Sequence, residues 1–447
     1  MQRETTYRDY LLSGNLYAKG WSKEDAIVSD HDKRILQELG KRLRVLAERP
    51  EEDKKAKLWA AHNDLRTDQP VVFIDCENGW GEILPWEKTI KCEGSMAQAW
   101  EMWIRKEICW AEELKDDKVI EAKLYLPYTA LDTEWGVDVE LVGNYEDGGA
   151  YTWKAPLEDM DEDAFEELDV EEFIKIPQII VDYEASEMVR QCAEDVFDGI
   201  LTIERRHSWW WGAELTHSYV NMRGLQNMMT DFYDFPEKVH EMMRRFTDGY
   251  LAKFDYLEKN GLLTSNTGSM YIGSGGIGYT NQLVDTAPEA AMLKNMWGFN
   301  ESQETSTVSP EMVNEYVLPY QHEIAEKFGL NYYGCCEGLD TRWEYVKNAI
   351  PRLRRVSVSP WADKRVMSEY LSNQYVYCLK VPPMDIAVEK MDEARIGKEL
   401  RETLQYCKEC GNIVEILMKD NHTLAKKREN AIKWVQIARE EIARVYA

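Results

Sequence analysis

The sequence predicts an α/β protein that folds as a (β/α)8 barrel, also called a TIM barrel. Eight short stretches have the composition of β-strands, and eight is the number of parallel strands that closes such a barrel. The last four of them alternate with helical patterns at the spacing of βαβ units. The chain has 447 residues, of which 44% are hydrophobic, so it can bury the large core that this fold needs.

An N-terminal helical extension is expected to precede the barrel. Residues 1–66 are polar, and apolar residues recur there at helical spacing between Ile35 and Leu65. The barrel itself is expected to span residues 67–447. Within it, acidic residues accumulate between positions 132 and 177, which indicates a solvated acidic insertion with a short helix.

The expected strands are short and mostly apolar. The first strand is apolar throughout, as expected of a strand that is covered on both faces. A helix capped by Ser95 follows it and carries Trp100 and Trp103 on one face. The eight expected strands are 71–74, 119–126, 200–203, a stretch within 262–272, 331–336, 354–359, 375–381 and 413–418.

Charge and composition exclude several classes of protein. The net charge is −27, from 54 basic and 81 acidic residues, which argues against binding to nucleic acid because phosphates demand a basic surface. No apolar run approaches the roughly 20 residues of a membrane span, and the N-terminus has no signal-peptide pattern. A cytoplasmic protein is therefore expected, in which the nine cysteines are reduced.

The segment 331–345 concentrates residues that carry chemistry. A strand-like run ends at Gly334, and Cys335, Cys336 and Glu337 follow it directly. Functional groups in parallel α/β proteins gather at this end of the strands. Two thiolates and a carboxylate suit zinc. The same two cysteines could equally be an inert buried pair beside a helix N-terminus.

Other candidate residues follow the remaining strands, and a closed barrel would bring them into one bowl. Glu204 and His207 follow the third strand and are the candidate catalytic residues, as acid, base or substrate anchor. A structural role for His207 remains the alternative. The glycine-rich run 273–279 is expected to be a lid over the substrate. The candidate substrate-binding residues are Glu77, Trp80, Trp209, Tyr271 and Tyr279.

The chain resembles the uroporphyrinogen decarboxylase superfamily, a family of (β/α)8 barrels. The resemblance covers roughly residues 70–445, and its most specific part is the run from Pro236 to Met243. It continues through the helix that ends at Gly261 and through the strand end at 334–337. The decarboxylases carry an arginine motif for tetrapyrrole carboxylates, whereas this chain has Asp75–Trp80 there, which argues against a porphyrin substrate.

A second branch of this superfamily contains corrinoid-dependent methyltransferases, which hold zinc with a His-x-Cys motif and a later cysteine. The cysteine of that motif matches Cys336, and Gly334 stands at the position of its histidine. His422 lies near the position of the later cysteine. The resemblance therefore implies zinc as a cofactor, with Cys336, Glu337, His422 and Cys335 as its ligands, and a corrinoid carried by a separate protein.

The leading hypothesis is a methyltransferase of the O-demethylase type, which moves a methyl group from a small O- or N-methylated substrate to the corrinoid protein. A methoxylated aromatic substrate would suit the Trp- and Tyr-rich strand ends. The first alternative is a decarboxylase or another lyase that acts on a small carboxylate, anchored by Arg205, Arg206 or Lys380. The second is a barrel that binds a ligand without catalysis. The sequence leaves the formation of a homodimer open.

Overall fold

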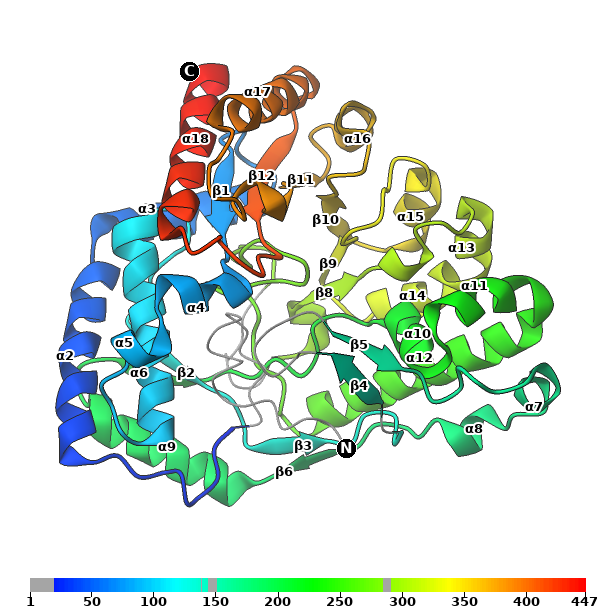
Figure 1. The fold of residues 1–447 in the computed structure, drawn as a ribbon, viewed down its shortest axis with the longest axis horizontal. Coiled ribbons are helices and arrows are strands. Elements are labelled where there is room, and N and C mark those ends of the chain that lie inside the picture. The colour runs from blue at the N-terminus through cyan, green and yellow to red at the C-terminus, as the bar shows by residue number, and fades with distance from the viewer. Residues whose placement is uncertain (1–19, 138, 144–150, 284–290) are drawn as a thin grey trace.

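The computed structural model describes residues 20–137, 139–143, 151–283 and 291–447. Its centre is a six-stranded sheet with the strand order β1-β12-β11-β10-β9-β8, in which all neighbours are parallel (Figure 1). The parallel α/β character predicted from the sequence is thereby confirmed. The strands are β1 (Val71–Ile74), β8 (Trp297–Asn300), β9 (Leu330–Tyr333), β10 (Leu353–Val358), β11 (Val376–Lys380) and β12 (Ile413–Met418).

The side chains of each strand alternate between two buried faces, as the pleat of a strand requires. In β12, Ile416 and Met418 pack into the larger hydrophobic cluster, together with the surrounding helices. Leu417 points to the opposite face and joins a smaller cluster inside the curve of the sheet. Because both faces are covered, these strands are buried along most of their length and mostly apolar. The covering helices of this half are α15 (Trp343–Ala349), α16 (Lys364–Leu371), α17 (Glu393–Cys410) and α18 (Arg428–Tyr446).

Two further parallel strands, β2 (Lys123–Leu126) and β7 (Thr202–Arg205), pair with each other. In the described residues no backbone ladder joins this pair to the six-stranded sheet, so closure of all eight strands into one ring is not shown.

Side chains occupy the two edges of the large sheet. At β1, the carboxylates of Asp116 and Asp117 accept from the backbone N–H groups of Ile74 and Val72 at 2.9 and 2.7 Å. At β8, the side chain of Asn266 bonds both backbone groups of Trp297, at 2.9 and 2.8 Å. Since the edge groups are satisfied in this way, they need no further strand.

One of the eight expected strands is wrong. Residues 262–272 are irregular, and within the described chain they form only an isolated antiparallel bridge between Tyr271 and Ile277. The apolar residues of this stretch are interrupted by the polar run 264–269, in which Gly268 has a φ of +94°. The strand that the sequence analysis missed is β8. It is short and contains a glycine, so it lacks a strong strand pattern.

The glycine-rich run 273–278 is also not a lid, because it is buried against the inner face of the sheet. A Cβ atom on Gly275 would lie 1.8 Å from Leu417, and one on Gly276 would lie 2.7 Å from both Arg355 and Glu415. Only glycine allows so close an approach. The run fills the inside of the curved sheet, above the buried ion pair of Arg355 and Glu415.

The remaining helices surround this centre. The N-terminal helix α3 ends beside the sheet, where Asn63 bonds Ile277 and Arg355, whereas helix α2 packs on α6 and α9. They are α2 (Asp30–Ala47), α3 (Pro50–Asn63), α4 (Trp80–Ile83), α5 (Trp86–Thr89), α6 (Ser95–Cys109), α9 (Tyr183–Phe197), α10 (Leu215–Arg223), α11 (Leu225–Asp234), α12 (Pro236–Lys259), α13 (Pro310–Tyr316) and α14 (Leu318–Ala325).

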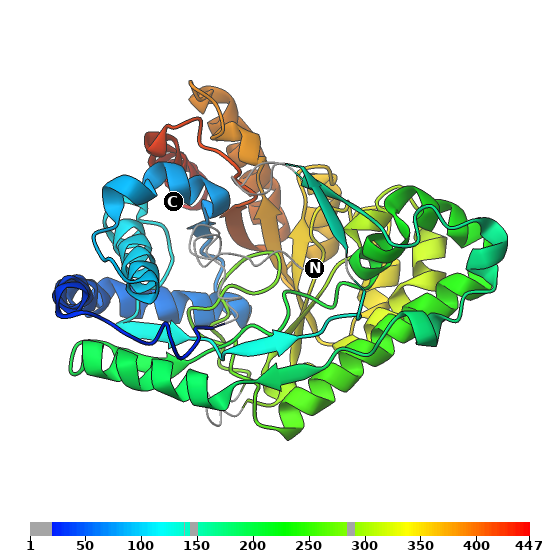
Figure 2. The ribbon, with the colours of Figure 1, turned by 60° about the horizontal axis from the view of Figure 1, so that its bottom comes forward.

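The acidic insertion has more structure than the single short helix that was expected. Its antiparallel strand pair of β4 and β5 lies beside α10, where the Trp153 indole donates to the Val220 carbonyl (Figures 1 and 2). Among the described residues, no helix combines the length and the apolar character that a membrane crossing requires. The elements of the insertion are β4 (Glu140–Gly143), β5 (Tyr151–Lys154), α7 (Glu162–Glu166) and α8 (Val170–Phe173). The antiparallel pair of β3 (Ala130–Asp132) and β6 (Ile179–Val181) flanks it.

Candidate functional site

Polar and charged side chains gather where the parallel strands end. On β10, Arg355 and Ser357 face the inside of the sheet, so Ser359 lies on the same face at the strand's carboxyl end. Cys378 of β11 and Leu417 of β12 also face the inside of the sheet. Lys380, at the end of β11, and Lys419, just after β12, each lie two residues further along, so they are on the same inner face. Ser359 and the two lysines are at least 90% buried. Charged groups this deeply buried require partners, and these partners define the site.

Cys335 lies at the centre of this group. Gly334, with a φ of +95°, ends β9 and turns the chain. The thiol of Cys336 then lies 3.8 Å from that of Cys335, sulfur to sulfur. The hydroxyl of Ser274 donates to the Cys335 sulfur at 3.1 Å, and Lys380 donates to the Ser274 carbonyl at 2.7 Å. The buried glycine-rich run thus joins Cys335 to Lys380.

The two thiols differ in their ionisation. The hydrogen bond from Cys336 and the nearby charges of Lys380 and Lys419 lower the pKa of Cys335 to about 5. The hydrogen bond to Cys335, together with burial, raises the pKa of Cys336. The ammonium groups of Lys380 and Lys419 and the Ser274 hydroxyl thus favour the thiolate form of Cys335 over that of Cys336.

A carboxylic acid lies beside these charges. Burial raises the pKa of Glu77 to about 8; the charge of Lys419 opposes this rise, and Asp75 and Asp420 add to it. Lys419 forms an ion pair with Asp420 at 2.6 Å, and its charge holds the pKa of Asp420 below the usual value although burial acts in the other direction. Glu77 is therefore protonated at neutral pH between charged neighbours, which is the state required of a general acid.

Two buried hydroxyls of this region have no hydrogen-bond partner within the described chain, those of Tyr271 and Ser359. Tyr271 lies near the acids Glu77, Asp75 and Asp420, which together with burial raise its pKa. Buried polar atoms are almost always satisfied, so unpaired hydroxyls here indicate space for the polar atoms of a ligand or for water.

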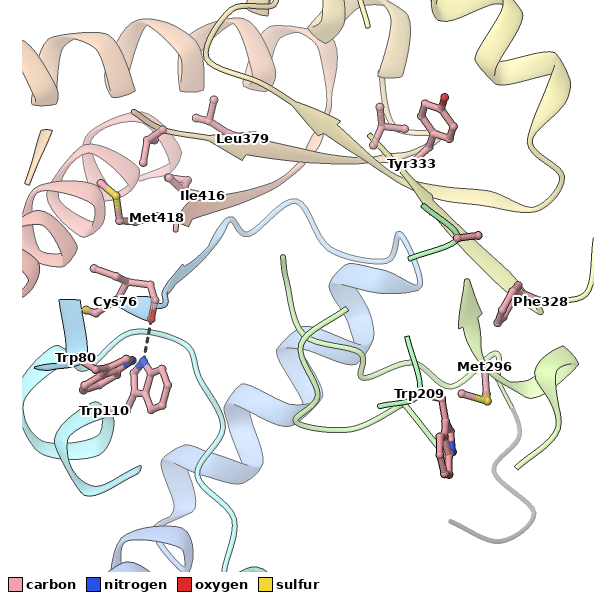
Figure 3. Packing of buried hydrophobic residues seen from close by; sticks show 14 of the residues in the cluster. Cys76, Trp80, Trp110, Trp209, Met296, Phe328, Tyr333, Leu379, Ile416 and Met418 are labelled. Carbon is pink, nitrogen blue, oxygen red and sulfur yellow. Dashed lines mark hydrogen bonds between the residues drawn. The ribbon is translucent and has the colours of Figure 1, made fainter. Parts of the chain in front are cut away.

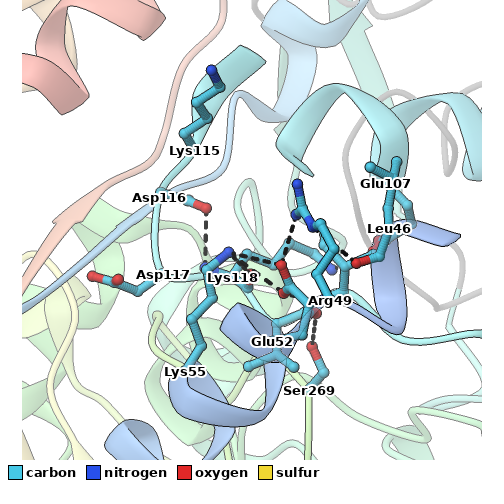
Figure 4. A network of polar contacts seen from close by, with 12 residues as sticks. Leu46, Arg49, Glu52, Lys55, Glu107, Lys115, Asp116, Asp117, Lys118 and Ser269 are labelled. Carbon is cyan, nitrogen blue, oxygen red and sulfur yellow. Dashed lines mark hydrogen bonds and ion pairs between the residues drawn. The ribbon is translucent and has the colours of Figure 1, made fainter. Parts of the chain in front are cut away.

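A cavity of about 80 Å³ opens beside Tyr271, between β1, α6 and the run 269–277. On one wall Lys118 pairs with Glu107 at 2.7 Å (Figure 4). On another, the indole of Trp110 bonds the Ile74 carbonyl and packs edge to face against Trp80 (Figure 3). The cavity combines aromatic rings with charged groups. It is lined by Phe73, Asp75, Trp103, Lys106, Glu107, Trp110, Lys118, Val119, Glu121, Tyr125, Ser208, Ser269, Met270, Tyr271 and Ile277.

The four predicted metal ligands are not gathered around one point. Both carboxylate oxygens of Glu337 accept from backbone N–H groups, those of Ser302 at 2.9 Å and Cys335 at 2.8 Å. His422 is exposed, and its Nδ1 atom pairs with Asn78 at 3.1 Å. Across the part of the chain that the structure describes, no three His, Cys, Asp or Glu side chains form a group that could hold a metal. The residues present do not fit the expected zinc site.

The predicted catalytic pair lies at the end of β7. Glu204 forms ion pairs with Lys123 at 2.8 Å and Arg206 at 2.7 Å. Burial raises the pKa of Glu204, but the charges of Arg206 and Lys123 lower it by more than burial raises it, so the pKa lies below the usual value. Glu204 is therefore an ionised partner of two cations. Burial lowers the pKa of His207 to about 3, and its neutral ring accepts from the Tyr128 N–H at 3.0 Å. Both are held by neighbours on the β2–β7 side.

The predicted substrate-binding residues fall in different places. Trp80 is fully buried and donates to Asp75 at 3.0 Å, so it supports the end of β1. Trp209 stacks on His207 with 3.8 Å between ring centroids, and both line a second cavity of about 40 Å³. Tyr271 lines both cavities. Tyr279 donates to Glu121, a residue of the larger cavity, at 3.2 Å.

Sequence reasoning missed Lys419 and Ser274. Lys419 directly follows the strand 413–418, which was located correctly, so its position at the strand end could have been read from the sequence. Ser274 carries no such signal, because it reaches Cys335 only through the fold of the buried glycine-rich run.

No model of a known protein family matches the chain, and the comparison with curated proteins gives no match. Among solved structures, the chain is similar to one described as a methyltransferase from Methanosarcina mazei. The sequence identity is 11%, and the TM-score is 0.46. The match covers 88% of this chain and 98% of the other chain.

Proposed function

We propose that this protein is a methyltransferase, which moves a methyl group from a small O- or N-methylated compound to a corrinoid carried by a separate protein. The proposed reaction takes place at the carboxyl ends of the strands. The proposed architecture is a (β/α)8 barrel, which the six-stranded sheet and the β2–β7 pair complete without a backbone ladder between them in the described residues. The observation that carries the proposal is the placement of protonated Glu77 beside Lys419 and Asp420 at this end.

Glu77 gives its proton to the oxygen or nitrogen atom that loses the methyl group. Without a proton donor, breaking the bond between methyl carbon and oxygen would release an alkoxide or phenoxide. With a proton from Glu77 the leaving group is a neutral alcohol or phenol, which departs more readily. The bond's electron pair stays on that heteroatom, the proton from Glu77 joins it, and the methyl carbon passes to the acceptor. Lys419 then stabilises the carboxylate that Glu77 becomes.

Cys335, Lys380 and Ser274 hold the neighbouring part of the site in place. The Cys335 thiolate balances the buried charges of Lys380 and Lys419, and Ser274 connects Lys380 to the sulfur. These are positioning residues, which act through the orientation of Lys419. The unpaired hydroxyls of Tyr271 and Ser359 are available to the polar atoms of the donor.

A corrinoid would supply the methyl acceptor, and the sequence resemblance is the reason to propose it. Its carrier protein must reach the strand ends, and the loops there offer apolar contacts. Trp361, after β10, is 75% exposed, and Met384, after β11, is 69% exposed. Exposed large apolar residues at one end of a molecule suit the docking of another protein. The proposed reaction needs no zinc, and the described residues do not form a zinc site.

The test incubates the protein with a reduced corrinoid protein and a series of O- and N-methylated donors, and follows the spectrum of methyl-cobalt. Methyl-cobalt should form with at least one donor class and should depend on Glu77. No methyl-cobalt with any donor, from a folded protein, would overturn the proposal.

A lyase that acts on a small carboxylate is the second candidate, and the two buried lysines at the strand ends favour it. Lys380 and Lys419 could anchor a carboxylate. In the structure Lys380 donates to the Ser274 carbonyl and Lys419 pairs with Asp420, so a substrate carboxylate would compete with these partners. The two expected arginine anchors are also engaged, since Arg205 donates to the backbone of Pro127 and Ser186, and Arg206 binds Glu204. A lyase would release carbon dioxide from a carboxylate donor without any corrinoid, so the same incubations distinguish the two reactions.

A further inference from the structure

Cys335 and Cys336 are adjacent in the chain, and their side chains also lie on the same side of it. Their sulfur atoms are 3.8 Å apart, although successive side chains of an extended strand point to opposite faces. The turn at Gly334, whose φ is +95°, ends the strand and allows this arrangement. The pair is thus held in a conformation in which one sulfur can reach the other.

The surroundings of the two sulfurs differ. Cys335 is 4% exposed, accepts from the hydroxyl of Ser274 at 3.1 Å and lies near the charges of Lys380 and Lys419. Cys336 is more open to solvent. Hydrogen-bond donors and ammonium groups around a sulfur favour its thiolate form, which is the form that peroxides oxidise. One sulfur is therefore prepared as a nucleophile, and the other is the nearby thiol that could resolve it.

We propose that Cys335 and Cys336 form an oxidative modification site, in which a hydroperoxide oxidises Cys335 and Cys336 then closes a disulfide with it. The inference concerns the chemistry of the two sulfurs and does not depend on the methyl-transfer reaction. It applies to hydrogen peroxide, which is small enough to approach a nearly buried sulfur beside an accessible one.

The two steps balance. The Cys335 sulfur attacks one oxygen of the peroxide, an S–O bond forms and the O–O bond breaks. The leaving hydroxide takes a proton from the solvent and departs as water, which leaves the sulfenic acid Cys335–SOH. The Cys336 sulfur then attacks the Cys335 sulfur, an S–S bond forms and the S–O bond breaks. The thiol proton leaves with the hydroxyl group as a second water. The two sulfurs together lose two electrons, and the peroxide gains them.

The other described cysteines provide internal controls. All nine cysteines are free, and Cys192 and Cys410 resemble Cys336 in their partial exposure. Both lie on helices, and neither shares the arrangement of Ser274 and two lysines around Cys335. A reaction governed by exposure alone would modify Cys192 and Cys410 at least as fast as the proposed pair. A reaction governed by the site would begin at Cys335.

The experiment treats the reduced full chain with substoichiometric hydrogen peroxide at pH 7 and maps the peptides by mass spectrometry. The peptide that contains Cys335 and Cys336 should lose two hydrogen atoms, about 10-fold faster than Cys410 or Cys192 is modified. Dithiothreitol should restore its mass. In Cys336→Ser the reaction should stop at the sulfenic acid, which dimedone traps on Cys335, whereas Cys410→Ser should behave as the wild type.

Two results would overturn the inference. The first is oxidation of Cys192 or Cys410 while the pair stays reduced. The second is an unchanged pattern in Cys336→Ser, with no sulfenic acid on Cys335. Because the wild type and Cys336→Ser decide the question, it does not depend on whether a Cys335 variant folds. Methyl transfer is not measured, so a failure here leaves the proposed function untouched, and failure of the transfer assay leaves this site untouched.

Discussion

The ammonium group of Lys419 and the carboxylate of Asp420 form an ion pair of 2.6 Å at the end of β12. Glu77, at the end of neighbouring β1, lies close to both charges and still keeps its proton up to a pH of about 8. Three ionisable groups thus lie together, the buried Lys419 beside the partly exposed Glu77 and Asp420, and only one of the two acids is in the neutral form. Environments that separate the pKa values of neighbouring groups in this way are typical of sites that transfer protons.

The first prediction concerns the pH dependence of methyl transfer. The rate should fall as the pH rises through about 8, because Glu77 then loses the proton that it gives to the leaving group. The measurement is the rate of methyl-cobalt formation between pH 6 and 9.5. Glu77→Gln should have a low rate without this alkaline fall. The same fall in Glu77→Gln as in the wild type would assign it to another group.

Acid stability should depend on His207. Burial lowers its pKa in the folded chain to about 3, whereas an unfolded chain has the ordinary value near 6.5. Between these values the unfolded state binds more protons, so the free energy of unfolding decreases as the pH falls, by up to about 1.4 kcal/mol per pH unit. Urea unfolding at pH 7, 6, 5 and 4 measures this slope. His207→Gln should be less stable at pH 7 and should have a flatter slope, and equal slopes would contradict the burial of a neutral imidazole.

Replacement of Gly275 by alanine should destabilise the fold. A Cβ atom there would lie 1.8 Å from Leu417 in the buried interior, so the free energy of unfolding should fall by more than about 2 kcal/mol. Gly261→Ala is the matched control, because its positive φ is similar in kind but no atom lies within 4 Å of its Cβ position. It should cost about 1 kcal/mol. Equal losses in the two variants would mean that the glycine-rich run is not packed against β12.

Glu337 should act as a structural residue. Its carboxylate accepts two backbone hydrogen bonds, so Glu337→Ala should lower the free energy of unfolding by about 3 kcal/mol because two buried N–H groups lose their acceptor. Glu337→Gln keeps the oxygen acceptor on one side and should lose less. Both are measured by urea unfolding, with and without a metal chelator. A loss that appears only when metal is present would instead support the ligand role expected from the sequence.

The sequence predicts the parallel α/β half of the molecule well, for a physical reason. From residue 330 onward mostly buried strands alternate with helices in the order that the sequence pattern predicts, so local pattern and tertiary environment agree. The strand 413–418 was located at its observed ends. Between residues 200 and 300 the local sequence pattern and the tertiary environment disagree. Leu262, Leu263 and Ile272 belong to an irregular buried segment, whereas β8 is a four-residue strand whose burial is decided by distant residues.

Residues of the candidate site could be predicted from the sequence where they lie at the ends of strands that the sequence pattern reveals. Glu77 was identified because it follows a correctly located strand. Cys335 and Cys336 were identified because they were placed at the carboxyl end of a strand expected over 331–336, and in the structure this strand ends at Tyr333, before both cysteines. Their roles were not readable, since the state of Glu77 depends on Lys419 and Asp420, more than 340 positions away in the chain. Likewise, the sequence alone could not show that the carboxylate of Glu337 binds backbone N–H groups.

The central claim is that Glu77 protonates the group that loses its methyl. The most direct test compares the single-turnover rate of methyl transfer to the corrinoid protein at pH 7 for the wild type, Glu77→Gln and the exposed control Glu409→Gln. The account predicts a loss of about 100-fold or more for Glu77→Gln with an O-methylated donor, and none for the control. A wild-type rate in folded Glu77→Gln would contradict it.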